Sequence, residues 1–167
     1  MPSGRILVVD DEGPQREIIR RILDAEGYFV ETAPGGGEAV TRCQEKPFDL
    51  ILTDLRMPGT DGLSLVERLT RDDPPTLVIL MTAFGSMDSA QHAVERGAFD
   101  YLTKPIEREE LLLTVERAFE RIRLIQENRL LRQQLEERFR VEGIVGSHFR
   151  MQEVFEKIGR ASCRERV

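Results

Sequence analysis

The sequence has no tryptophan, only two cysteines and no long hydrophobic run. Cys43 and Cys163 lie far apart without paired spacing, so neither a disulfide framework nor a zinc site is expected. No apolar stretch approaches the roughly 18–20 residues that span a bilayer. The chain also starts without the basic and apolar regions of a secretory signal. These absences predict a cytoplasmic protein without membrane association.

Positive charge is also in short supply. The 24 Lys and Arg residues are outnumbered by 30 Asp and Glu residues, which gives a formal net charge of −6 at neutral pH. A nucleic-acid clamp carries a dominant basic face, so no direct DNA binding by this chain is expected. The length of 167 residues suits one main domain of about 100–200 residues with an appendage.

Five short apolar runs, rich in β-branched residues, mark the first two thirds of the chain. They are Ile6–Val9, Tyr28–Thr32, Phe48–Thr53, Thr76–Thr82 and Phe99–Thr103. Segments with helical spacing lie between them, such as Ile18/Ile22 with Ile19/Leu23, and later Leu63, Val66 and Leu69. The alternation predicts βαβ crossovers and a parallel sheet.

The composition of the runs predicts their order in the sheet. The first, third and fourth contain the continuously apolar stretches Ile6–Val9, Leu50–Leu52 and Leu77–Met81, as central parallel strands do. The second and fifth are interrupted by Glu31 and Asp100, as edge strands can be. This indicates a flavodoxin-like, doubly wound (βα)5 sheet of order 2-1-3-4-5, in which function gathers at the carboxyl ends of the strands.

Each of the first, third, fourth and fifth runs leads into a distinctive polar group. These groups are Asp10-Asp11-Glu12, Asp54, Thr82-Ala83 and Lys104-Pro105. In the predicted order the four runs are neighbours, so all these groups converge on one cleft. A helix N-cap is the common role of an Asp pair after a strand, and Thr or Lys-Pro at a strand end is commonplace. The joint pattern at four strand ends favours a functional site.

The residue types indicate phosphoryl transfer. Three carboxylates repel one another unless a cation lies between them, and a hard cation such as Mg²⁺ prefers oxygen ligands. Lys104 and Thr82 would complete a pocket for a small oxyanion. Because no Cys, His or Ser is placed there, the nucleophile would be a carboxylate that forms an acyl phosphate. Asp54 is the best-placed candidate.

The joint pattern resembles the receiver domain of two-component response regulators, from about Arg5 to Arg121. The matching stretches are Ile6–Glu12, Asp49–Gly59, Met81–Ala83 and Gly97–Pro105. The resemblance implies that Asp54 accepts a phosphoryl group from a partner histidine kinase. It also implies Mg²⁺ held by Asp11, Asp54 and the backbone carbonyl of Arg56, with Asp10 acting through water.

The same resemblance implies a conformational switch. Lys104 would contact the phosphoryl group, and the Lys104–Pro105 bond would be cis, a form that proline makes accessible. Thr82 and Tyr101 match the switch pair of the family, in which the hydroxyl moves to the phosphate and the ring turns inward. The remodelled surface would run from about Ser86 to Arg121.

A long helix is predicted from Glu107 to about Val141, because this stretch contains neither Gly nor Pro. One apolar stripe comprises Leu111, Val115, Ala118, Ile122 and Ile125, and a second comprises Leu124, Asn128, Leu131 and Leu135. The second stripe can belong to a single solvated helix. Alternatively, this stripe forms a short coiled coil, in which Asn128 fixes the register of a homodimer through Ala118–Phe139.

The segment from Arg121 to Lys157 resembles response regulators of the nitrogen-regulatory protein C (NtrC) type, which activate sigma-54 transcription. We therefore expect a receiver at 4–121, a coiled-coil linker at 122–141 and the truncated start of an AAA+ ATPase domain at 142–157. No G-x-x-x-x-G-K-[ST] loop occurs, so no ATPase activity is expected of this chain. Residues 158–167 match the translation of a common sequencing adapter and are expected to be a non-native tail, a natural basic tail being the alternative.

Two other functions remain open on the sequence. One is a stand-alone receiver or dimerisation module without ATPase output. The other is an Asp-nucleophile phosphatase. Such enzymes commonly carry a second acid two residues after the nucleophile, whereas Arg56 holds that position here.

Overall fold

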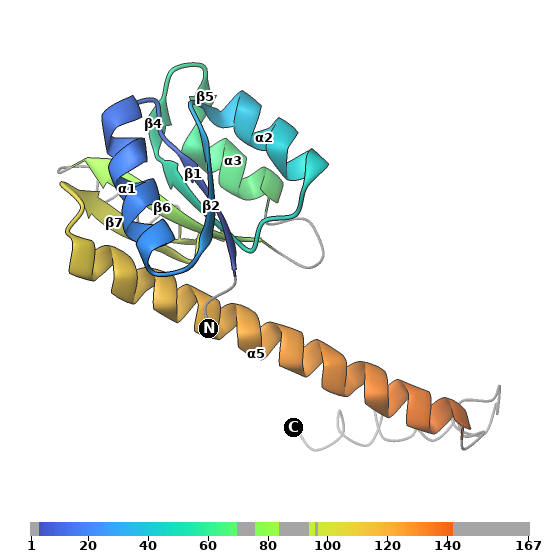
Figure 1. Ribbon diagram of the computed structural model, residues 1–167. Helices are drawn as coiled ribbons and strands as arrows, with labels where there is room; N and C mark the ends of the chain where they lie inside the picture. Colours follow the sequence, from blue (N-terminus) through green and yellow to red (C-terminus); the bar gives the residue numbers. More distant parts are fainter. Residues whose placement is uncertain (1–3, 70–75, 84–93, 96, 142–167) are drawn as a thin grey trace, which may run out of the picture. The chain divides into compact units, whose positions relative to one another are not determined.

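The computed structural model describes residues 4–69, 76–83, 94–95 and 97–141. Its main sheet contains the strands β1 (Arg5–Val9), β2 (Phe29–Ala33), β3 (Leu50–Asp54), β6 (Leu77–Ala83) and β7 (Asp100–Lys104). Their order is β2-β1-β3-β6-β7 and every pairing is parallel (Figure 1). Since β6 and β7 are the fourth and fifth predicted strands, the predicted order 2-1-3-4-5 is confirmed.

The strand ends differ slightly from the prediction. The strands β2, β3, β6 and β7 each end one residue later than expected. Asp54 and Lys104 are therefore the last members of the ladder, paired with Met81 and Ala83. Backbone pairing does not depend on side-chain polarity, so the polar residues that seemed to end the strands still belong to them.

Helices cover both faces of the sheet because the strand side chains alternate. Ile6 and Val8 pack in one hydrophobic cluster with α1 (Gly13–Ala25) and the first turns of α5 (Arg108–Val141). Leu7 and Val9 pack in the other, with α2 (Gly36–Glu45) and α3 (Gly62–Leu69). This period of two is the repeat of a β-strand that is buried on both faces.

The predicted central and edge strands are confirmed. β3 is buried at every position and β1 at all but its first, whereas β2 and β7 contain mainly half-buried residues. Phe29 at the start of β2 is 67% exposed. Glu31, the acid that interrupts β2, forms ion pairs with Arg5, Arg42 and Lys46.

A short hairpin directly after β3 was not predicted. Its strands are β4 (Arg56–Met57) and β5 (Thr60–Asp61), which pair antiparallel. Gly59 takes a φ of +79° in the turn, a conformation that favours glycine. Gly62 follows, and a Cβ at this position would lie 2.5 Å from the Asp54 carbonyl oxygen and 3.0 Å from the Leu55 Cα. The hairpin therefore folds tightly against the end of β3.

The long helix is confirmed as α5, which runs for 34 residues. Its early stripe is fully buried at Leu111, Val115 and Ala118. The second stripe is about half exposed at Leu124, Leu131 and Leu135. No helix in the described ranges is both long enough and apolar enough to cross a membrane.

The chain divides into two compact units, Met1–Leu124 and Ile125–Val167. The first unit contains the whole sheet, and the described part of the second is the continuation of α5. The expected ATPase start at 142–157 and the expected tail at 158–167 lie outside the described residues. Residues 84–93 of the expected switch surface do too.

The tight approach at Gly62 predicts a large effect of Gly62→Ala on stability. The new methyl group would meet backbone atoms of Asp54 and Leu55, which cannot move without disturbing β3. We expect a loss of about 1–3 kcal/mol in the free energy of unfolding, measured by urea denaturation.

Gly37→Ala is the matched control, because a Cβ at Gly37 meets no atom within 4 Å and this glycine lies inside α2. Alanine there should be neutral or stabilise by up to about 1 kcal/mol. Equal destabilisation by both substitutions would contradict the steric explanation.

Candidate phosphoacceptor site

The alternation of the strands places three charged side chains on one side of the sheet. Each of these side chains comes two residues after a member of the hydrophobic cluster that packs against α1 and α5, and therefore lies on the same side of its strand. The cluster members are Val8 before Asp10, Leu52 before Asp54 and Leu102 before Lys104. The backbones that carry them are also adjacent, because Val9 pairs with Thr53, Asp54 with Met81 and Ala83 with Lys104. The convergence that the sequence predicts is therefore present for these three side chains.

The Lys104 ammonium bridges two carboxylates. Its Nζ donates to Asp54 Oδ2 at 2.7 Å and to Asp10 Oδ2 at 2.9 Å. The Lys104 side chain is only 15% exposed, and that of Asp10 is fully buried. Burial alone lowers the pKa of Lys104, but the hydrogen bonds that it donates to Asp54 and Asp10 and the charges of both acids outweigh this effect and raise the pKa. The ammonium stays charged.

Backbone amides hold the other oxygen of each acid. The Glu12 N–H donates to Asp10 Oδ1 at 2.8 Å, and the Arg56 N–H donates to Asp54 Oδ1 at 3.1 Å. Helix α1 has Glu12 as its N-cap, with no side-chain cap hydrogen bond. Neither aspartate caps α1, so the alternative N-cap role of the acid pair is wrong.

Asp11 completes a group of three acids. One carboxylate oxygen from each of Asp10, Asp11 and Asp54 lies within 4.8 Å of the others. Asp11 is exposed while the other two are buried. Three carboxylates outnumber the nearby cations, Lys104 and Arg16, so the site keeps a net negative charge that a further cation would relieve. The charge and the all-oxygen donor set fit a divalent cation such as Mg²⁺.

Thr82 and Tyr101 lie on the opposite side of the sheet from Lys104. Thr82 follows Val78 and Leu80 of the cluster under α2 and α3, and the Tyr101 ring packs against that same cluster. Thr82 is buried, and its hydroxyl donates to the Ala83 carbonyl at 3.3 Å. The Lys104–Pro105 peptide bond is cis.

One cation near the acids was missed by the sequence reasoning. Arg16 in α1 donates from Nη1 to the backbone carbonyl of Asp10. Arg16 lies about one turn into the helix that follows the acid pair, and this position could have indicated that its side chain reaches the acids. The amide of Arg56 was also missed, since only its carbonyl was considered.

Comparison with known proteins gives the family. Residues 6–116 match the model of the response regulator receiver domain. Over 162 residues, 97% of this chain and 34% of the other, the sequence is 36% identical to the DNA-binding transcriptional regulator NtrC of Escherichia coli K12. A second relative is the C4-dicarboxylate transport transcriptional regulatory protein DctD of Pseudomonas aeruginosa. The two sequences are 37% identical over 157 residues, which are 93% of this chain and 34% of DctD. The chain thus spans about a third of the length of these relatives.

Solved structures agree. NtrX from Brucella abortus matches 95% of this chain with 34% of its own, at a TM-score of 0.78 and 31% identity. A response regulator receiver domain protein from Clostridium thermocellum matches 73% of this chain with 98% of its own, at a TM-score of 0.69 and 31% identity. The fold predicted from the strand pattern is the fold of this family.

The shared ammonium predicts a stability effect of Lys104→Met. Without it, the buried Asp10 and Asp54 face each other with no cation between them. In the absence of divalent cations we expect a loss of about 2–4 kcal/mol in the free energy of unfolding, measured by urea denaturation.

Lys46→Met removes the same charge from an exposed pair with Glu31 at 3.8 Å, which is worth at most about 1 kcal/mol. Similar losses in the two variants would show that Lys104 does not hold the acids together.

Proposed function

Because this chain belongs to the response regulator receiver family, we propose that Asp54 accepts a phosphoryl group from a partner histidine kinase. A carboxylate oxygen of Asp54 attacks phosphorus, the bond to the imidazole nitrogen of the kinase breaks, and an acyl phosphate forms. The imidazole leaves with the electron pair of that bond. The chain is then a phosphoacceptor switch, and its only expected turnover is loss of its own phosphoryl group.

The observation that carries this proposal is the position of Lys104 between Asp10 and Asp54. Its Nζ and the Arg56 amide hold both oxygens of Asp54, so the nucleophile is oriented before a donor arrives. A fixed positive charge beside the attacked phosphorus favours phosphoryl transfer, which depends mainly on positioning and charge neutralisation.

A metal ion belongs to the proposed site. Asp11, Asp54 and the backbone carbonyl of Arg56 would hold Mg²⁺, with Asp10 acting through water. When bound, Mg²⁺ supplies positive charge to the phosphoryl oxygens and relieves the repulsion among the acids. Asp11 is the exposed member of the group and faces solvent. Asp10 keeps both oxygens engaged with Glu12 and Lys104, which suits an indirect role.

The proposed switch uses the two faces of the sheet. The phosphoryl group brings a charge of about −1.5 to −2 and strong hydrogen-bond acceptors to the end of β3. Lys104 would then donate to the phosphoryl oxygens. The Thr82 hydroxyl would leave the Ala83 carbonyl for the phosphate, and the Tyr101 ring would turn inward on the face that it shares with Thr82. Local electrostatics would thereby bias a packing rearrangement.

The output follows from similarity to NtrC and DctD. We propose that the receiver at 4–121 and the linker at 122–141 regulate, in the full-length protein, a sigma-54-dependent transcription activator whose ATPase domain starts at 142–157. This activity belongs in the cytoplasm, where transcription takes place.

Phosphorylation of Asp54 is the first test. After treatment with acetyl phosphate and Mg²⁺, the intact mass of the chain should increase by one phosphoryl group. The adduct should be absent in Asp54→Asn and without Mg²⁺. Asp24→Asn is the matched control, because Asp24 is an exposed aspartate of α1 that pairs with Arg20. This variant should be phosphorylated like the parent.

An adduct that persists in Asp54→Asn would assign the nucleophile elsewhere. If no adduct appears, binding of a beryllofluoride mimic distinguishes rapid hydrolysis from an inactive site. Sustained turnover of small phosphate esters would instead identify an Asp-nucleophile phosphatase.

We also propose that the chain forms a homodimer through Ala118–Phe139. The apolar positions Leu124, Leu131 and Leu135 remain about half exposed on α5, with spacings typical of a coiled-coil seam. Asn128 at a seam position would fix the register of the two helices.

Leu131→Asp should therefore convert the dimer to a monomer in sedimentation equilibrium, because a carboxylate would enter the seam. Leu113→Asp is the control, since Leu113 is equally exposed but lies outside the proposed seam. A chain cut after Arg121 should be monomeric. A dimer that survives the cut would place the interface within the receiver.

A further inference from the structure

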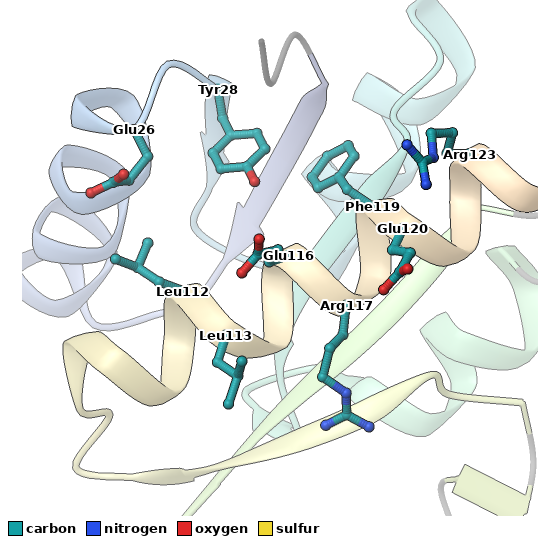
Figure 2. A pocket seen from close by; sticks show the side chains of 9 residues that line it. All are labelled: Glu26, Tyr28, Leu112, Leu113, Glu116, Arg117, Phe119, Glu120 and Arg123. Atoms are coloured by element: carbon teal, nitrogen blue, oxygen red, sulfur yellow. The ribbon is translucent and has the colours of Figure 1, made fainter.

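A groove lies far from the phosphoacceptor site, along the first turns of α5. It has a volume of about 820 Å³, and its lining comes from the end of α1, the start of β2 and α5 (Figure 2). The lining residues are Glu26, Tyr28, Leu112, Leu113, Glu116, Arg117, Phe119, Glu120 and Arg123. The stretch from Leu112 to Arg123 covers roughly 17 Å of helix at about 1.5 Å per residue. This length suits about five residues of extended peptide.

Two aromatic rings, together with Leu112 and Leu113, form the apolar part of the groove. Tyr28 and Phe119 stack with centroids 4.9 Å apart and an interplanar angle of 23°. Phe119 occupies the space where a Cβ of residue 4 would lie, 1.9 Å from its ring, so Gly4 is required for this packing. The rings are therefore held in place and offer a fixed surface on which a flat group can stack.

Three glutamates and two arginines line the groove, which gives its lining a formal charge of 2 − 3 = −1. Glu116 is turned toward Tyr28 (Figure 2). Burial raises the pKa of the Tyr28 hydroxyl, and the nearby charges of Glu116 and Glu26 raise it further. Arg117 is directed away from Tyr28 and pairs with Asp100 at 3.3 Å, while Glu26 is paired with Arg108 at 3.1 Å.

Within the described residues, Glu116 and Glu120 take part in no ion pair, and neither does Arg123, the second arginine of the lining. The two glutamates stand four residues apart on one helix, where like charges are mutually unfavourable. A cation between them and above the rings would relieve this repulsion. A guanidinium does so best, because it stacks on aromatic faces and donates in pairs to carboxylates.

We propose that this groove binds an arginine-bearing peptide segment of a partner protein. The arginine side chains would stack over Tyr28 and Phe119 and pair with Glu116 and Glu120. Gly4 and Tyr28 lie at the amino ends of β1 and β2, whereas Asp54 lies at the carboxyl end of β3. The partner would therefore leave the phosphoacceptor site accessible to a kinase, and the two interactions are separate.

The test uses the full chain and a defined probe, the capped peptide Ala-Arg-Ala-Arg-Ala. Its two arginines share one side of an extended backbone. Because the chain has only two tyrosines, the Tyr28 ring signals are readily separated in an NMR titration. We expect the peptide to shift the ring signals of Tyr28 and Phe119. The double variant Glu116→Gln/Glu120→Gln should weaken binding about tenfold.

Two controls isolate the groove. Glu109→Gln/Glu110→Gln changes the net charge equally on exposed residues of α5 outside the groove, and it should alter affinity less than about twofold. A peptide with citrulline in place of both arginines keeps the shape but loses the charge, and it should not bind. All variants should be phosphorylated like the parent, so a failure of the groove and a failure of Asp54 phosphorylation are distinguishable.

Several results would overturn the proposal. Equal weakening by both double variants would indicate attraction to the acidic chain as a whole. Equal binding of the citrulline peptide would exclude charge recognition. Shifts confined to the Asp10–Asp11 region would place the cation in the acid cluster. Ring signals of the Leu131→Asp variant that depend on protein concentration without peptide would show that a second copy of the chain occupies the groove.

Discussion

The ammonium of Lys104 is the interaction on which the site depends. It is shared by two buried carboxylates from different strands, at 2.7 Å and 2.9 Å. Without it, Asp10 and Asp54 would be like charges within a buried corner, a costly arrangement. Because we propose that the same ammonium donates to the phosphoryl group, the contact that stabilises the resting protein is the one that phosphorylation would rearrange.

The sheet places the charged groups and the proposed switch residues on opposite faces. The strand alternation that sends Asp10, Asp54 and Lys104 to the α1 and α5 side sends Thr82 and Tyr101 to the α3 side. The proposed phosphoacceptor and the proposed switch pair therefore approach the strand ends from opposite faces. Helix α5 contributes Leu111, Val115 and Ala118 to the first face and runs on to Val141. The element that closes the core is thus the one that leads to the proposed output.

Much of the fold was accessible from the sequence because it rests on short-range patterns. Apolar runs separated by helical spacing predicted the strands, and the acids in the second and fifth runs predicted the edges. The absence of Gly and Pro predicted the length of α5. The hairpin β4–β5 could not be predicted, because its two-residue strands carry no periodicity. The tight contact of Gly62 with Asp54 depends on backbone atoms that only the folded chain brings together.

The sequence by itself determined which residues share one edge of the sheet, since parallel strands of known order must bring Asp10, Asp54, Thr82 and Lys104 to it. Tertiary structure decided which of these side chains meet and through which atoms. Hydrogen-bond partners are set by distances of tenths of an ångström, and a pattern of residue types does not carry them. Only the folded chain showed that Lys104 bridges two acids, that backbone amides hold their remaining oxygens and that Arg16 binds the Asp10 carbonyl. The groove beside Tyr28 and Phe119 likewise exists only because residues 4, 28 and 119, remote in sequence, pack together.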